Sequence, residues 1–418
     1  WSDSDETPQE FLFELVKPKD IATATVKLYL NDGYTVPEVD PDPPVAFDTP
    51  AYSEMIARSC LSTGNNIRIK RVLQQLRDGK PTTIAFLGGS ITQGSLTTQP
   101  ENTYAYRVYR WWCETFPQAK FHYVNGGIGG IDSLYGVSLA VTDPLMYQPD
   151  FVVLDFSVND TRNTFCQETY EGAVRRILSW PSRPALVLLH NIYYDSGLTT
   201  EAQHGAVGDW YALPRVSVQN TIYRQMKDGQ YTMQQLTPDG LHPNDFGHGL
   251  VAEEITKLLA DVNAQRDEPE AESPLPAPLT ANAYENAQRL TLREACPALH
   301  GFRADTREKL GHLDHWKNGW FAQKAGDSLT FTVDCSCLAV QFRRTIQRPA
   351  LQAQLVMDGD TAHPILLDGN FDEDWGDSLA LTPVLHHAPR ARHTVTITAL
   401  PSAAPDPTPF YLLSLILA

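Results

Sequence analysis

Between residues 80 and 265, short apolar runs alternate with segments in which apolar residues recur at helical spacing. The runs that we expect to be strands are 82–87, 121–125, 151–156 and 185–190. The segments that we expect to be helices are 103–116, 168–178, 216–227 and 246–262. Strands that are apolar throughout are typical of a parallel sheet with helices on both faces. The pattern therefore predicts a three-layer α/β/α domain over residues 80–265.

After residue 280 the pattern changes to short runs in which apolar and polar positions alternate. These runs are 328–333, 339–342, 351–357 and 394–400, and the last nine residues, 410–418, indicate one more, buried strand. Residues 281–418 are therefore expected to form an all-β sandwich or jelly roll that folds as a unit of its own.

Two further segments complete the predicted organisation. Residues 266–280 are rich in proline and glutamate, which is typical of a semi-rigid linker. Residues 1–79 form an N-terminal extension, with strand-like alternation at 22–30 and helical spacing in the second half of 52–77.

Composition and charge exclude several classes of function. Subtracting 50 acidic residues from 33 basic ones gives a formal net charge of −17. Nucleic acid and anionic membrane are poor partners for such a chain, since phosphate binding requires a basic face. No run approaches the roughly 20 apolar residues of a membrane-spanning helix. The first residues lack the basic and apolar regions of a signal peptide, so we expect a cytoplasmic protein. Secretion stays open, because the chain begins with Trp1 rather than methionine.

The six cysteines are scattered over a long chain, which is not the pattern of a disulfide scaffold. Cys335 and Cys337 form a lone C-x-C pair without histidine or cysteine partners nearby in the sequence. Such a pair indicates structure rather than a metal site, so we expect no metal and a reducing compartment.

Two glycine-rich segments follow predicted strands. The segment 88–94 places Ser90 directly after the first strand, and 125–130 follows the second. Ligands of open α/β sheets bind at the carboxyl ends of strands. A serine at that edge, among glycines that let the backbone approach closely, is a candidate nucleophile. Backbone N–H groups of the second segment are candidate donors to an oxyanion. The simpler interpretation of the first segment is a turn with a capping serine.

Polar residues at two other places add the remaining chemistry. Asn159 follows the third strand, and its side-chain amide is another candidate oxyanion donor. Asp239 and His242 precede the last helix, three residues apart. His242 can deprotonate Ser90, and Asp239 can orient the imidazole. Each segment alone is an ordinary turn, but together they supply a nucleophile, a base, an orienting carboxylate and oxyanion donors.

The sequences GGSIT, NGGIGG, SVND and DGLHP resemble the four blocks of the SGNH hydrolases, the GDSL-type esterases. The resemblance covers about residues 80–265 and implies an α/β/α fold with a parallel sheet. It implies a triad of Ser90, Asp239 and His242 that needs no metal or cofactor.

The resemblance also implies the oxyanion hole. Its donors would be the N–H of Ser90, the N–H of Gly130 and the side chain of Asn159, with Gly129 as the alternative to Gly130. The chain departs from the family at two positions, where Gly89 replaces the usual Asp and Ser157 replaces the usual Gly. Neither change removes a catalytic atom.

The GGSIT form is more similar to carbohydrate O-acetylesterases than to the lipase branch of the family. The two-domain arrangement resembles gut-bacterial carbohydrate esterases that deacetylate polysaccharides, with acetylmannan esterases as the preferred members. The expected partner is thus an acetylated oligosaccharide or polysaccharide, mannan first and xylan as another possibility. The alternatives are a lipid or thioester hydrolase and a carbohydrate-binding protein without activity. The second would lack a triad member, and none is missing.

Two aromatic features could contact a sugar. Trp210 and Tyr211 fall in a predicted loop, 195–213, where they either stack on sugar or pack within the loop itself. The C-terminal module carries several tryptophans and resembles carbohydrate-binding domains. The alternative is that it is a rigid structural support that covers one side of the catalytic cleft.

Overall fold

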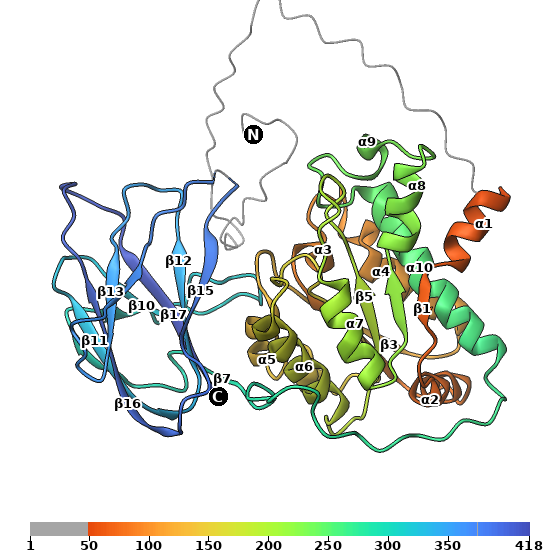
Figure 1. Cartoon of the computed structure of the whole chain (residues 1–418), viewed down its shortest axis with the longest axis horizontal. Helices are drawn as coiled ribbons and strands as arrows, with labels where there is room; N and C mark the ends of the chain where they lie inside the picture. Colours follow the sequence, from red (N-terminus) through yellow and green to blue (C-terminus); the bar gives the residue numbers. More distant parts are fainter. Residues whose placement is uncertain (1–48, 374) are drawn as a thin grey trace, which may run out of the picture.

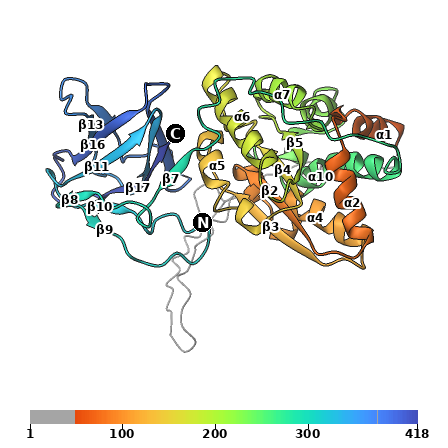
Figure 2. The same cartoon turned by 90° about the horizontal axis from the view of Figure 1, so that it is seen from below.

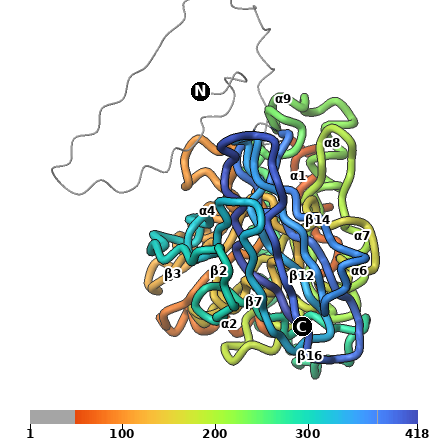
Figure 3. Tube along the Cα trace, turned by 90° about the vertical axis from the view of Figure 1, so that its left-hand side faces the viewer, coloured from red at the N-terminus to blue at the C-terminus, as the bar shows by residue number. Residues whose placement is uncertain are grey.

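The computed structural model describes residues 49–418 except residue 374. The strand expected at 22–30 lies outside the described residues. In the described range an α/β part and a β-sandwich lie side by side. An irregular segment joins them and crosses the lower edge of the α/β part (Figure 1). Figure 3 shows the sandwich in front of the α/β part.

A sheet forms the middle layer of the α/β part, and its described strands have the order β1-β6-β5-β4-β2-β3. All neighbours pair in parallel except β1, which is antiparallel to β6. The strands are β1 (Cys60–Ser62), β2 (Thr82–Gly88), β3 (Phe121–Gly127), β4 (Phe151–Asp155), β5 (Ala185–His190) and β6 (Arg215–Ser217). In β4, Val153 belongs to the core on one face while Val152 and Leu154 belong to the core on the other. Burial on both faces explains why these strands are apolar throughout.

Helices cover both faces of this sheet (Figure 2). Those on one face are α1 (Pro50–Ala57), α2 (Ile67–Arg77), α4 (Tyr104–Thr115) and α10 (Asp245–Ala264). Those on the other are α5 (Ser133–Leu139), α6 (Thr164–Leu178) and α7 (Glu201–Trp210). Shorter elements are α3 (Ser90–Gln93), α8 (Arg224–Lys227), α9 (Met233–Leu236), the 3-10 turns η1 (Pro100–Asn102) and η2 (Leu145–Tyr147), and the π-helical turn η3 (Gln219–Tyr223). The predicted three-layer architecture is confirmed.

Two predicted elements are wrong in part. The helix expected at 216–227 begins instead with strand β6, which is too short for its pattern to stand out against the helical residues after it. The loop expected at 195–213 contains helix α7. The buried positions of α7 include His204, Gly205 and Gly208, so small and polar residues take the place of the apolar stripe that marks a helix.

The C-terminal residues form the predicted sandwich of two antiparallel sheets. The first described sheet has the order β15-β12-β17-β10-β9, with β7 also pairing with β17, and the second has the order β14-β13-β16-β11-β8. Its strands are β7 (Gln288–Leu290), β8 (Ala298–His300), β9 (Arg303–Ala304), β10 (Trp320–Ala322), β11 (Ser328–Cys335), β12 (Leu338–Arg344), β13 (Ala353–Met357), β14 (Ile365–Leu367), β15 (Ser378–Leu385), β16 (Ala391–Ala399) and β17 (Phe410–Leu417). We refer to residues 281–418 as the β-module.

Strand β17 is buried on both faces. Leu412 and Leu415 face the core between the two sheets of the sandwich. Leu413 and Ile416 belong instead to the core that also contains the residues of α5 and α6. This second face explains why β17 is apolar throughout, unlike the alternating strand β11. The β-module therefore shares a core with the α/β part, although its sequence pattern predicts a separate unit.

Polar contacts fasten the same junction. The guanidinium of Arg176, which is buried, donates to the carbonyl oxygens of Val137 at 2.6 Å and Ala287 at 2.7 Å. Glu171 accepts hydrogen bonds from the N–H groups of Leu279 at 2.6 Å and Thr280 at 2.8 Å. The end of the linker is thus bound to α6.

The earlier part of the linker follows the surface of the α/β part. Glu270 pairs with Lys70 at 2.9 Å, and Glu272 pairs with Arg68 at 2.8 Å. Residues 266–280 are therefore attached along their length rather than held out as a spacer. No helix in the described part of the chain combines the length and the apolar character that crossing a bilayer requires.

Replacing Leu413 by alanine should lower the free energy of unfolding by about 2–5 kcal/mol, because it opens a cavity in the shared core. Chemical denaturation followed by circular dichroism measures the change. Leu366, which is 56% exposed on β14, gives the control Leu366→Ala, with an expected change below about 0.5 kcal/mol. Equal stability of Leu413→Ala and the wild type would contradict a core shared by the two parts.

Candidate active site

Ser90 lies at the carboxyl edge of the parallel sheet, just after strand β2, which pairs with β4 on one side and with the edge strand β3 on the other. It is the first residue of α3, and only 9% of its surface is exposed. The preceding turn is crowded, since a Cβ atom on Gly89 would come within 2.1 Å of Oδ1 of Asn159. A Cβ atom on Gly127 would come within 2.2 Å of the backbone nitrogen of Gln93. Glycine at these positions lets the loops after β2, β3 and β4 converge on Ser90.

His242 lies within hydrogen-bond distance of Ser90. Its Nε2 is 2.7 Å from Oγ of Ser90, and its Nδ1 is 2.6 Å from Oδ2 of Asp239. The other oxygen of Asp239 accepts the backbone N–H groups of Leu241 at 2.9 Å and His242 at 2.7 Å. The structure thus brings together the three predicted residues in the order nucleophile, base and orienting carboxylate.

The loop between α9 and α10 holds His242 in this position. Gly240 has φ +80°, which lets the chain turn between Asp239 and His242. Its carbonyl oxygen accepts the N–H groups of Tyr194 at 2.7 Å and Asp195 at 3.1 Å, which ties the loop to the segment after β5.

The environment keeps the carboxyl group of Asp239 charged. Partial burial acts to raise its pKa, but the hydrogen bond and positive charge of His242, with the backbone donors, outweigh burial and lower the pKa to about 2. A carboxylate at this position can stabilise an imidazolium that forms during a reaction.

Two of the candidate oxyanion donors, Asn159 and Gly129, lie beside Ser90 or the glycine that precedes it. Asn159 lies against Gly89, as the close approach of its side chain shows. In the loop after β3, the N–H of Gly129 donates to Oε1 of Gln93 at 2.6 Å. This bond occupies Gly129, and it favours Gly130 as the backbone donor. Gln93 was missed in the sequence because no motif marks it.

The two departures from the family pattern have local partners. Ser157 donates from Oγ to Oδ1 of Asp155 at 2.6 Å, and it accepts the N–H of Asn191 at 2.6 Å. Asn191 in turn donates its amide to Asp155 at 2.6 Å. These buried bonds fix the turn that carries Asn159. Gly89, the other departure, leaves the room that the side chain of Asn159 fills.

A second buried network supports the same turn. Asp160 accepts the N–H of Ser133 at 2.8 Å, and its other oxygen is 2.9 Å from Nε2 of His204. The ring of His204 stacks on Tyr170 at 3.5 Å. Burial raises the pKa of Asp160 and lowers that of His204, so it favours the neutral form of each. Asp160 therefore joins the Asn159 turn to the start of α5.

A model of the GDSL-like lipase/acylhydrolase family matches residues 86–250. A solved structure of a two-domain esterase (CEX) active on acetylated mannans, co-crystallised with mannopentaose, is 43% identical to this chain. The match covers 86% of this chain and 97% of that one, with a TM-score of 0.84. A second structure described as the same two-domain esterase matches with equal identity and coverage and a TM-score of 0.85. The chain belongs to the GDSL-like lipase/acylhydrolase family.

The resemblance drawn from the four motifs is therefore confirmed, and this GDSL-like hydrolase shares its two-domain organisation with those structures. A search of curated protein sequences found no match.

Trp210 and Tyr211 do not join the site. Helix α7 begins at the carboxyl edge of the sheet, where the N–H of Thr200 donates to the carbonyl of Ser157 at 2.8 Å. Trp210 ends this ten-residue helix, roughly 14 Å further along its axis at 1.5 Å per residue. Its indole donates to the linker carbonyl of Ala277 at 2.8 Å, and Tyr211 is buried against Glu171. Trp210 contacts the linker directly and Tyr211 contacts Glu171, which binds the linker, so neither is placed to stack on a sugar at Ser90.

An aromatic residue of the β-module, Trp375, lies close to the loop after β3. A Cβ atom on Gly130 would lie 3.8 Å from Cη2 of Trp375, so the indole ring lies beside the glycine-rich segment 125–130, which we call the oxyanion loop. Trp375 is 55% exposed and packs edge-on against Phe371 at 5.0 Å. Its indole N–H donates to Glu373 at 2.6 Å. The sequence could not place this residue, because it is far from the motifs in the chain.

Replacing Gly89 by alanine tests the crowding around Ser90. The added methyl group would displace the side chain of Asn159, so we expect activity on an aryl acetate to fall by about 100- to 1000-fold, as for loss of one oxyanion donor. Thermal stability should change little, because the displaced group is a side chain. Asn159→Ala should show the same loss, and the double variant should be no worse than either. Additive losses in the double variant would refute the shared cause.

Proposed function

We propose that this protein is a serine esterase that removes O-acetyl groups from a carbohydrate, with acetylated mannan as its preferred polymer. The observation that carries the proposal is the chain of two short contacts, 2.7 Å from Ser90 to His242 and 2.6 Å from His242 to Asp239. The choice of acetylated mannan is supported by the 43% identity to an esterase active on such mannans.

The proposed reaction proceeds through an acyl-enzyme. Oγ of Ser90 attacks the acetyl carbonyl carbon while Nε2 of His242 takes the hydroxyl proton. The ester C–O bond breaks, and His242 returns the proton to the departing sugar oxygen. Water then attacks the acetylated serine, again losing a proton to His242, and acetate leaves as Ser90 recovers its hydrogen. Throughout, Asp239 stabilises the imidazolium.

The developing negative charge on the carbonyl oxygen needs donors. We assign this role to the N–H of Ser90, the N–H of Gly130 and the side-chain amide of Asn159. Gly129 is the weaker candidate, since its N–H already donates to Gln93 at 2.6 Å. Preorganised donors of this kind stabilise the transition state more than the substrate.

Acetate release from acetylated mannan oligosaccharides, followed by mass spectrometry, tests the proposed substrate. Xylan and pectin oligosaccharides and aryl esters of increasing chain length complete the panel. We expect kcat/KM to be highest on mannan and to fall sharply from acetyl to butyryl to octanoyl aryl esters. A rate that rises with acyl length, without acetate from any sugar, would identify a lipid esterase instead.

Ser90→Ala should lose activity on the order of a million-fold while remaining folded, and Asp239→Asn should lose about 10,000-fold.

The β-module contributes to this substrate site through Trp375. An exposed indole beside the oxyanion loop offers an apolar face on which a sugar ring can stack. We expect Trp375→Ala to lower kcat/KM about ten-fold on an acetylated oligosaccharide, or about 1.4 kcal/mol, and to leave an aryl acetate unaffected. Trp210→Ala is the matched control, because Trp210 is 48% exposed but lies at the linker. Equal effects of Trp375→Ala on both substrates would argue against stacking.

A further inference from the structure

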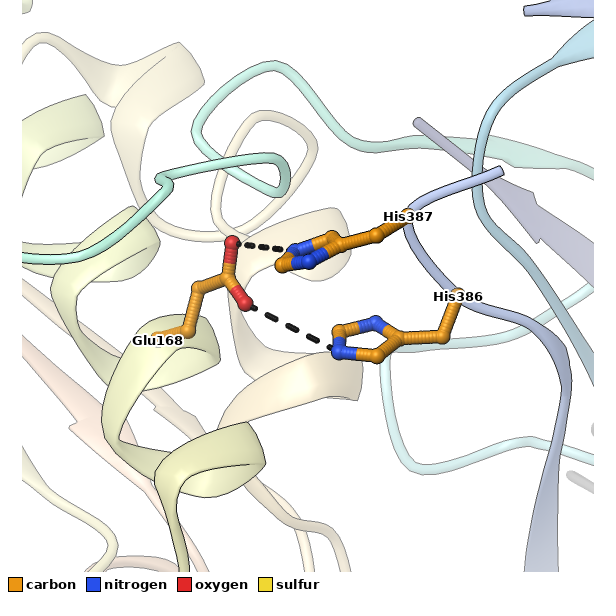
Figure 4. Close-up of side chains that lie close together, drawn as sticks. All are labelled: Glu168, His386 and His387. Atoms are coloured by element: carbon orange, nitrogen blue, oxygen red, sulfur yellow. Dashed lines mark hydrogen bonds and ion pairs between the residues drawn. The ribbon is translucent and has the colours of Figure 1, made fainter. Parts of the chain in front are cut away.

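A cluster of potential metal ligands lies where the β-module meets helix α6, apart from the triad. Glu168 belongs to α6, and His386 and His387 directly follow strand β15. Among the described residues, one ligand atom from each of the three side chains lies within 4.8 Å of the others. Figure 4 shows both imidazole rings directed at the same carboxylate.

The distances suit a small ion. Nε2 of His387 is 2.9 Å from one oxygen of Glu168, and Nε2 of His386 is 4.0 Å from the other. Ligands bound at about 2.0–2.1 Å in a tetrahedral zinc site lie roughly 3.3 Å from one another. The observed separations lie on either side of that value, so a small closing of His386 would complete the geometry.

The backbone is shaped to aim both rings. Successive side chains of an extended chain normally point in opposite directions. His387 has φ +53°, an uncommon conformation for a residue with a side chain. As a result its ring stacks on that of His386 with centroids 3.9 Å apart, on one side of the chain. Local strain of this kind is often found at binding sites.

Surrounding groups orient the three side chains. The hydroxyl of Tyr284 is 2.7 Å from Nδ1 of His386, which leaves Nε2 directed at the carboxylate. Partners of the second ring nitrogen fix ligand orientation in metal sites. The carboxylate of Glu168 is only 5% exposed and also accepts the N–H of Ala283 at 2.8 Å. Both histidines are 40% exposed, so an ion and its water ligands can reach them.

We propose that Glu168, His386 and His387 form a zinc site that joins the β-module to helix α6. Imidazole and carboxylate ligands suit Zn²⁺, with water in the fourth position. The sequence alone does not predict this site, because Glu168 and His387 are 219 residues apart and no spacing motif links them. An ion held by both parts stabilises the folded, docked state, since the ligands come together only there.

Titration of the chelator-treated full-length protein with Zn²⁺ tests the proposal, by calorimetry and by thermal melting. We expect one ion per chain and a higher Tm. The visible spectrum of Co²⁺ bound at the same site, lost on adding Zn²⁺, should indicate nitrogen and oxygen ligands in a four-coordinate geometry. Absence of saturable binding at one ion per chain, or a six-coordinate Co²⁺ spectrum, would overturn the proposal without any variant.

Variants locate the site. His386→Ala and His387→Ala should each abolish the Tm shift, and Tyr284→Phe should weaken binding about ten-fold through ring orientation. His363, an exposed histidine of the same module that pairs with Asp360 at 2.9 Å, supplies the control His363→Ala, which should bind normally. Unchanged binding in a folded double variant of His386 and His387 would assign the ion to another place and refute the site.

Discussion

The burial of strand β17 on both faces is the constraint on which the rest of the structure depends. One face closes the core of the sandwich, and the other contributes Leu413 and Ile416 to the core of α5 and α6. Exposing either apolar face of β17 to water would cost free energy, since burying one leucine side chain is worth about 1.5–3 kcal/mol. The β-module is therefore fixed against the hydrolase part, and two of its loops acquire positions that their own sequences do not specify. One brings Trp375 to the oxyanion loop, and the other brings His386 and His387 to Glu168.

Within the hydrolase part, the geometry of the reactive groups depends first on the close approach of backbone segments. The loops after β2, β3 and β4 end at the same edge of the sheet, and glycines at 89 and 127 allow them to touch. Buried hydrogen bonds then fix what has been brought together, through Asp155 and Ser157 on one side of Asn159 and through Asp160 and His204 on the other. The base, His242, lies on a different loop, the one before α10.

Much of this arrangement could be predicted from residues alone. Apolar runs located β2, β4 and β5 to within a residue or so, and the edge of a parallel sheet is where Ser90, Asn159 and the glycine-rich loop had to meet. Prediction failed where the signal is not periodic. Helix α7 buries glycine and histidine, so its sequence lacks the apolar stripe by which a helix is predicted. Trp210 is therefore expected in a loop, although it is the last residue of that helix. Contacts between distant segments, such as Trp375 with Gly130, leave no trace in a single sequence, because nothing local depends on them.

The shared core also bears on how the protein unfolds. By sequence pattern the chain consists of two domains and a proline-rich linker, and such chains often melt in two separate transitions. Here residues such as Tyr284, Leu413 and Ile416 lose their surroundings as soon as either part comes apart. The shared core is incomplete in either part alone, so we expect the described chain to unfold in a single cooperative transition. The two domains of this protein are therefore distinct in fold, but we expect neither to have the full stability that it has in the whole chain.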